Sequence, residues 1–261
     1  MDFKSKAFLG EDIKEYQKIN EKENLYLDLS KRINIMLNEN IELMTGQINT
    51  HKDIMIVALT LKSLQTFNSI IILSVHGLEA DSKALLRVLA EGIIQLGAII
   101  KDEDYYDEFL KKADFQTLMI ANNLRKDEHK GILRHDTIAA VQDMDFTALE
   151  KLVQTISKDS LSLYKVSQRA GMLEIYIYIY GELSKYVHSN ASIRDEYVDF
   201  ENGLLKGFSN IPREEDQQYV LLTSNYLLLK LIDFYNDYFD GRLDNMIREL
   251  WEENKILFGE S

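Results

Sequence analysis

The chain contains no cysteine, one proline and 12 glycines among 261 residues. Without cysteine there is no disulfide framework, no thiolate nucleophile and no cysteine-ligated zinc or iron–sulfur centre. So little proline and glycine leaves few residues that interrupt helices. Because 46% of the residues are hydrophobic, the chain can fill a real core, which excludes disorder of the whole chain.

Positive charge is also scarce, with 30 basic against 43 acidic side chains and a formal net charge of −13. This balance argues against a protein that coats duplex DNA or an anionic membrane. The first residues lack the apolar core of a signal peptide, and no apolar run approaches the ~20 residues that span a bilayer. We therefore expect a cytoplasmic protein with neither membrane nor DNA as a partner.

Known catalytic motifs are missing too. The sequence has no Gly-rich phosphate loop, no dinucleotide fingerprint, no Gly-x-Ser-x-Gly elbow and no kinase-type set. None of its histidines belongs to a His-Glu-x-x-His or Glu-x-x-His pattern; they are His51, His76, His129, His135 and His188. We expect no metal and no cofactor.

What the sequence does contain is helical periodicity from end to end, without repeats or linkers. It predicts an all-α, single-domain multi-helix bundle over residues 1–261. Residues 53–76 are apolar enough for a helix buried on most sides and ending at Gly77, and Asp81 or Ser82 is expected to cap the next helix. The other expected helices cover residues 11–44, 84–100, 103–126 (capped by Asp102), 145–157, 171–189, 214–239 and 243–258.

Two stretches between these helices are expected to be irregular. Residues 127–145 lose the periodicity, which indicates a loop or a short helix, and residues 191–213 indicate an exposed connection. The basic run 125–135 is either a solvated loop or an RNA-facing segment. The single tryptophan, Trp251, is expected in core or interface packing.

The segment Ile175–Tyr180 alternates isoleucine and tyrosine, a pattern typical of a strand. However, the sequence continues as GELSKYVH without a turn signal, and a lone strand would leave its backbone unpaired. We predict a helix.

Two polar stripes cross these apolar helices. On the first, Arg87, Glu91 and Gln95 recur every four positions. A buried arginine needs a partner, and Glu91 is the nearest in sequence. The stripe is either an intrahelical salt bridge facing water or a pair with a tertiary use.

The second stripe consists of Tyr176, Tyr180, Ser184 and His188, again four residues apart. Histidine titrates near neutral pH, and the hydroxyl groups can hold it or a ligand by hydrogen bonds. The bland interpretation is a core histidine bonded to a neighbouring hydroxyl.

The residues of both stripes resemble the motifs of a known family. An Arg-x-x-x-Glu helix followed by Tyr-x-x-Leu-Ser-x-x-x-His resembles the prokaryotic domain-of-unknown-function family numbered five-six-seven-seven, over a core of about residues 50–195, with helices 11–44 and 214–258 added. The matching residues are Arg87, Glu91, Tyr180, Leu183, Ser184 and His188. More distantly, the segment Leu183–His188 is similar to the signature of HEPN-type ribonucleases, with Leu183 where that signature has arginine. Either Arg87 on the neighbouring helix takes the role of that arginine, or the nuclease chemistry has been lost.

The HEPN resemblance implies a HEPN-like core and a metal-independent ribonuclease that acts as a toxin or antiviral defence effector. His188 would then serve as acid or base and Arg87 would bind phosphate, with Glu91 orienting Arg87 and with Ser184 and Tyr180 positioning the histidine or the phosphate. The implied partners are RNA, a cognate antitoxin or other protein, and a second copy in a homodimer. The alternative is a non-catalytic interaction or ligand-binding protein in which the same residues form a buried polar network.

Overall fold

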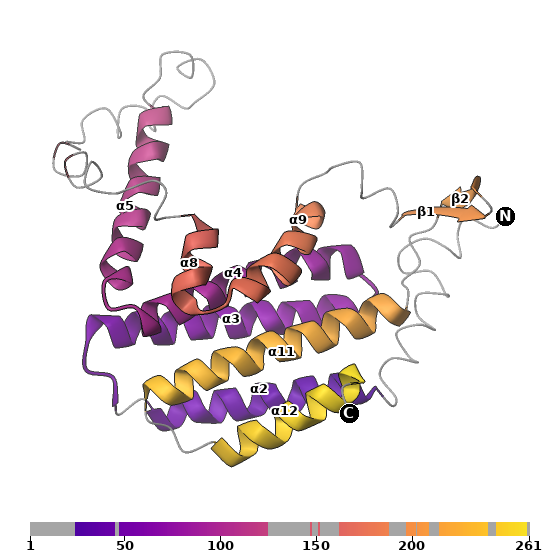
Figure 1. Ribbon diagram of the computed structural model, residues 1–261, viewed down its shortest axis with the longest axis horizontal. Coiled ribbons are helices and arrows are strands. Elements are labelled where there is room, and N and C mark those ends of the chain that lie inside the picture. Colours follow the sequence, from indigo (N-terminus) through magenta and orange to yellow (C-terminus); the bar gives the residue numbers. More distant parts are fainter. Residues whose placement is uncertain are drawn as a thin grey trace.

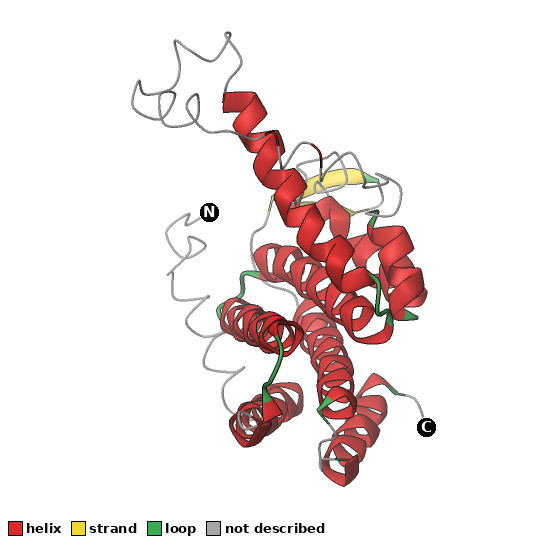
Figure 2. Cartoon of the chain, turned by 90° about the vertical axis from the view of Figure 1, so that its left-hand side faces the viewer, coloured by secondary structure: helices red, strands yellow, loops and turns green. Residues whose placement is uncertain are grey.

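The computed structural model describes residues 24–44, 47–124, 147, 151, 162–187, 197–201, 203–208, 214–239 and 244–259. This part of the chain is a bundle of helices with one small hairpin, so the predicted all-α fold is confirmed (Figures 1 and 2). The predictions for residues 11–23, 125–135 and 127–145 lie outside the described residues, as do those for 145–157 except Thr147 and Lys151.

The helices and strands of the described part follow one another along the chain. In order, they are α2 (Leu25–Met44), α3 (His51–Val75), α4 (Glu79–Lys101), α5 (Tyr105–Leu124), α8 (Leu163–Ala170), the π-helix η3 (Ile175–Tyr180), α9 (Gly181–Val187), β1 (Val198–Glu201), β2 (Leu204–Phe208), α11 (Glu214–Tyr238) and α12 (Asp244–Phe258).

Helix α4 lies at the centre of the bundle. It packs against α3 and α11, and the short helices α8, η3 and α9 cross its other side (Figure 1). Every residue from Ile93 to Ile99 is buried. Gly97 allows a close approach, since a β-carbon there would lie 3.0 Å from Phe234 Cε2 and 3.2 Å from Met172 Sδ.

Helix α3 ends where the sequence indicates. Gly77 follows it with a φ of +75°, a left-handed conformation that glycine adopts without strain. Burial on most sides was a wrong prediction, because Ile54, Leu61 and Ile72 are exposed on the face that no other described helix covers. Among the described residues, α3 is the helix long and apolar enough to cross a membrane, but 33% of its apolar window is buried, and core helices of soluble proteins meet the same criterion.

The predicted cap of α4 was also wrong. The helix begins at Glu79, and the preceding residue, Leu78, makes no side-chain cap. Ser82 already lies inside the first turn, where its hydroxyl donates to the Leu78 carbonyl at 2.9 Å. The chain turns tightly at Gly77, so that α4 begins two residues later, at Glu79, before the expected cap residues Asp81 and Ser82.

The alternating segment Ile175–Tyr180 is helical, as predicted, but it winds as a π-helix. Its end shows this winding, because the Gly181 N–H donates to the carbonyl of Tyr176, five residues earlier. The preceding helix α8 stops at Gly171, whose φ is +67°. The predicted helix 171–189 is therefore a composite that includes η3 and α9, with residues 188 and 189 outside the described part.

The predicted connection at residues 191–213 contains a hairpin. Strands β1 and β2 pair antiparallel, with an irregularity between Asp199 and Phe200. Gly203 turns the chain with a φ of +77°, and Leu204 beside it is 75% exposed. The described residues around this turn are largely exposed, as expected of a connection, but the sequence did not predict the hairpin that turns at Gly203.

Candidate functional site

The two polar stripes meet where η3 and α9 cross α4. The Arg87 guanidinium donates from Nε to Ser184 Oγ at 3.3 Å and from Nη2 to the Tyr180 hydroxyl. Its Cζ also lies 4.3 Å from the centre of the Tyr180 ring. All three side chains are half-buried. Three predicted site residues therefore form one cluster, although Arg87 is more than 90 positions from the other two in sequence.

Ser184 is held on two sides. Its hydroxyl accepts the Arg87 hydrogen bond and donates to the Tyr180 carbonyl one turn earlier, at 2.9 Å. This i−4 back-bond is the usual way for serine to satisfy its hydroxyl within a helix. This bond orients the Ser184 oxygen so that one of its lone pairs faces the Arg87 guanidinium.

A row of tyrosine rings continues from this cluster. Tyr176 and Tyr180 stack with centroids 5.3 Å apart and planes 17° apart, and Tyr164 meets Tyr176 edge-on at 5.7 Å. Burial raises the pKa of Tyr180 and the Glu91 charge adds to this, while Arg87 opposes it. The phenol therefore keeps its proton at neutral pH, so the oxygen that accepts from Arg87 also carries a donor.

His188 lies outside the described residues. It follows directly after Val187, the last residue of α9, and α9 also carries Ser184. The structure thus places the element that leads to His188.

Glu91 does not pair with Arg87. Among the described ion pairs, Arg87 has none with Glu91, because the guanidinium reaches across to η3 and α9. Arginine before glutamate is also the less favourable order for a pair four apart. The prediction that Glu91 orients Arg87 directly therefore finds no contact to support it.

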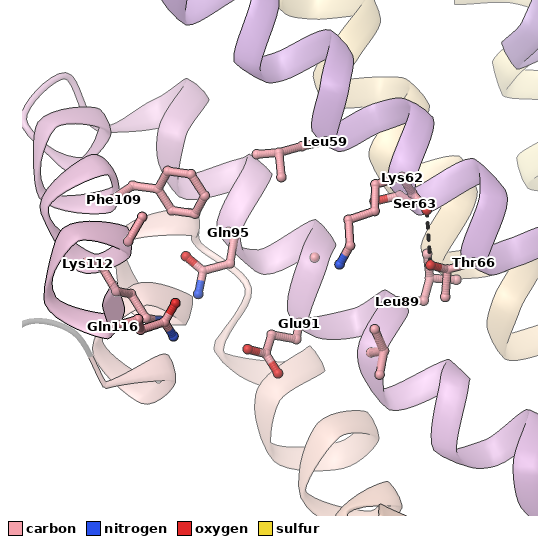
Figure 3. A pocket seen from close by; sticks show the side chains of 13 residues that line it. Leu59, Lys62, Ser63, Thr66, Leu89, Glu91, Gln95, Phe109, Lys112 and Gln116 are labelled. Atoms are coloured by element: carbon pink, nitrogen blue, oxygen red, sulfur yellow. Dashed lines mark hydrogen bonds between the residues drawn. The ribbon is translucent and has the colours of Figure 1, made fainter. Parts of the chain in front are cut away.

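Glu91 and Gln95 instead line a pocket of about 350 Å³ between α3, α4 and α5 (Figure 3). Lys62 and Thr66 of α3 form one wall, and Phe109 and Lys112 of α5 form another. Gln95, the third residue of the stripe, is buried and accepts a hydrogen bond from the Tyr105 hydroxyl. The first stripe thus serves two sites: Arg87 belongs to the cluster with Tyr180 and Ser184, and Glu91 and Gln95 belong to this pocket.

Sequence reasoning missed Lys83, one turn before Arg87 on the same stripe. Its buried ammonium donates to Asp216 of α11 at 2.7 Å and to the Tyr186 hydroxyl of α9 at 3.2 Å. Burial opposes the charged form, but these hydrogen bonds outweigh it and raise the pKa of Lys83. The spacing of four from Arg87 is the signal that would have found it.

No group of three or more histidine, aspartate or glutamate side chains suited to a metal ion occurs among the residues that the structure describes.

Comparison with known proteins gives one match. A family model described as "Family of unknown function (DUF5677)" matches residues 53–204, more than half of the chain. The matched range begins at the start of α3 and includes both stripes, which confirms the resemblance inferred from Arg87 to His188. No curated protein and no solved structure matches the chain.

Proposed function

The chain belongs to the DUF5677 family of unknown function, and from this premise we propose that it is a HEPN-like, metal-independent ribonuclease acting as a toxin or antiviral defence effector. The observation that carries the proposal is the contact of Arg87 with Tyr180 and Ser184. This contact brings a permanent cation to the helix that leads to His188.

The departure from the HEPN signature at Leu183 has a structural reason. HEPN-type signatures have arginine at this position, but Leu183 is 1% exposed and belongs to the hydrophobic core. An arginine there would bury its charge without a partner. In this chain Arg87 supplies the cation from the neighbouring helix instead.

The chemistry assigns a role to each group. When the 2′-hydroxyl of RNA attacks phosphorus, a base removes its proton, a cation stabilises the charge on the phosphate oxygens, and an acid protonates the leaving 5′-oxygen. His188 would serve as the base or the acid, and Arg87 would bind the phosphate. Because one histidine performs one proton transfer at a time, a second copy of the chain in a homodimer would supply the other.

The hydrogen bonds of Arg87 leave it able to bind phosphate. A guanidinium has five N–H donors, and within the described part of the chain Ser184 and Tyr180 take two of them. The remaining donors suit the oxygens of a phosphate group. Tyr180 and Ser184 would then position Arg87.

The test is RNA cleavage by purified Arg87→Ala and His188→Ala variants. We expect each to lose at least ~100-fold in rate, the range for losing a group that acts in proton transfer or charge stabilisation, with thermal stability nearly intact. Lys185→Ala is the matched control, because Lys185 is a cation on α9 that pairs with Glu182 at 3.9 Å. Cleavage, or growth arrest on expression, that is unchanged in both variants would show the proposal to be wrong.

A non-catalytic interaction or ligand-binding protein is the second candidate, and the polar contacts of α4 favour it. Arg87 is already hydrogen-bonded to two side chains, and Lys83 beside it ties α4 to α9 and α11. On this alternative, Arg87→Ala lowers the free energy of unfolding by about 1–3 kcal/mol, and neither the wild type nor the variants cleave RNA.

A further inference from the structure

A second pocket, of about 380 Å³, lies between η3, α11 and α12. Five aromatic side chains line it: Tyr178, Tyr219, Tyr226, Trp251 and Phe258. Tyr178 stands between Tyr176 and Tyr180 in η3, but it lines this pocket and not the cluster around Arg87. Tyr178 is 73% exposed, so the mouth of the pocket carries an aromatic residue that the described part of the protein leaves open to solvent.

Asn254 adds an unused hydrogen-bonding group to this pocket. The residue is 1% exposed, and its Oδ1 has no hydrogen-bond partner among the described residues. Buried amide oxygens are nearly always satisfied, because an acceptor without a donor loses its hydrogen bond to water. A ligand with an N–H donor would supply what is missing.

The remaining polar groups limit the charge of the ligand. Glu174 and Lys255 both line the pocket, and the Lys255 ammonium donates to Glu252 at 2.7 Å. The charges of Glu174 and Lys255 oppose each other, and Glu252 already holds the Lys255 ammonium. The pocket therefore favours a ligand without net charge. Aromatic walls favour a flat ring that can stack against them.

We propose that this pocket binds a nucleobase. A nucleobase is flat and neutral, stacks on tyrosine and tryptophan, and presents N–H donors at its edge. It would stack against the aromatic walls and donate one hydrogen bond to Asn254. The proposal stands apart from RNA cleavage, because none of the groups assigned to that chemistry lines the pocket.

Trp251 is the only tryptophan of the chain and lines this pocket, so tryptophan emission comes from this one position. The experiment titrates the full chain with adenosine, guanosine, cytidine and uridine, with a 2′-O-methyl oligoribonucleotide, and with ribose as the control ligand. We expect a saturable change in Trp251 emission with at least one nucleoside and none with ribose. No saturable change with any nucleoside or with the oligoribonucleotide overturns the proposal.

Two variants and a matched control assign the effect to the pocket. Tyr178→Ala and Asn254→Leu should each weaken binding by at least about tenfold, the loss expected for one stacking or hydrogen-bonding partner. Ile177→Ala should not, because Ile177 is 51% exposed on η3 and does not line the pocket. Since Tyr178 is exposed, its variant remains informative even if Asn254→Leu fails to fold. Unchanged affinity in Tyr178→Ala contradicts the proposal.

The oligoribonucleotide distinguishes a free nucleoside from a base within RNA. Its 2′-O-methyl groups cannot supply the attacking hydroxyl, so its binding is measured without cleavage. Binding at least tenfold tighter than that of the best nucleoside identifies the ligand as a base of an RNA strand, and equal binding identifies a free nucleoside; both support a nucleobase pocket. Because the readout is Trp251 emission, the result does not depend on whether the Arg87 site cleaves RNA.

Discussion

Lys83, Arg87 and Gln95 share one stripe of α4, yet each bonds to different neighbours. Lys83 reaches α9 and α11, Arg87 reaches η3 and α9, and Gln95 reaches Tyr105 at the start of α5. The stripe is therefore a polar seam along which the central helix contacts several others. The sequence shows the seam through its spacing but does not show the partners, which lie as far as 133 positions away.

The buried pair of Lys83 and Asp216 makes the first prediction at this scale. Asp216→Asn removes the charge that compensates a nearly buried ammonium, so it should lower the free energy of unfolding by about 2 kcal/mol. Lys83→Met removes the buried charge itself and should be less destabilising. Urea denaturation measures both. As control, Asp28→Asn alters a pair whose carboxylate is 66% exposed and should change stability by less than about 0.5 kcal/mol. Equal stability of Asp216→Asn and the wild type would contradict this account.

At the scale of elements, α3 shows how one side chain can fix two helices. Asp53 accepts hydrogen bonds from the backbone N–H groups of Asn49 and Thr50, both at 2.8 Å, and completes a capping box with Thr50. The Tyr238 hydroxyl donates to its other oxygen at 2.8 Å and so attaches the last residue of α11 to the start of α3.

This cap makes stability depend on pH. Burial raises the pKa of Asp53, but the hydrogen bonds outweigh it and lower the pKa below its usual 3.8. A carboxyl with a lowered pKa stabilises the fold at pH values above 3.8, and this contribution is lost as the pH falls through the folded-state pKa. Asp53→Asn should therefore cost about 1–2 kcal/mol at pH 7 and progressively less below pH 4.

Thermal melts of Asp53→Asn and wild type between pH 7 and pH 3 measure this difference. Asp107→Asn, an exposed change in the first turn of α5, is the control. A stability difference that is the same at both ends of the pH range would show that the Asp53 charge is not what stabilises the cap.

The same scale shows what periodicity can and cannot predict. It favoured helix over strand at Ile175–Tyr180 because every neighbouring segment is helical, and this is confirmed. It did not predict the π winding of this segment, in which the rings of Tyr176 and Tyr180 stack beside Arg87. That contact exists only once α4 lies alongside.

For the whole molecule, the position of α4 depends on Gly97. Phe234 of α11 and Met172 lie so near its Cα that a methyl group would meet both. A small residue at this crossing lets α11, and the segment between α8 and η3 that carries Met172, approach α4 more closely than a larger side chain would allow.

The corresponding prediction compares two glycine substitutions. Gly97→Ala should lower the free energy of unfolding by about 1–3 kcal/mol, because the added methyl group overpacks the core. Gly181→Ala should raise it by about 0.4–1 kcal/mol, because its φ of −61° suits alanine and the nearest atom, the Tyr176 carbonyl, is 3.5 Å away. Denaturant midpoints measure both, and a stabilising Gly97→Ala would rule out overpacking.

The sequence predicted the fold class and the positions of the described long helices, because these follow from local periodicity and the absence of breakers. It did not predict which face of α3 is exposed or that a hairpin forms around Gly203, because both depend on distant partners. For the site, the recurrence of polar residues every four positions predicted Arg87, Tyr180 and Ser184. The aromatic pocket was missed because Tyr178 and Asn254 have no pattern in common along the chain.

The π-helix has an evolutionary consequence. A turn closed from Gly181 to Tyr176 holds one residue more than an α-turn. Loss of a single codon from this stretch would let it rewind as an α-helix, because the wide turn already accommodates the extra residue. Everything downstream, Ser184 included, would keep its direction. Relatives that are one residue shorter between the two tyrosines are therefore expected to keep the contact with Arg87, whereas a one-residue loss within α9 before Ser184 would rotate this serine by about 100°.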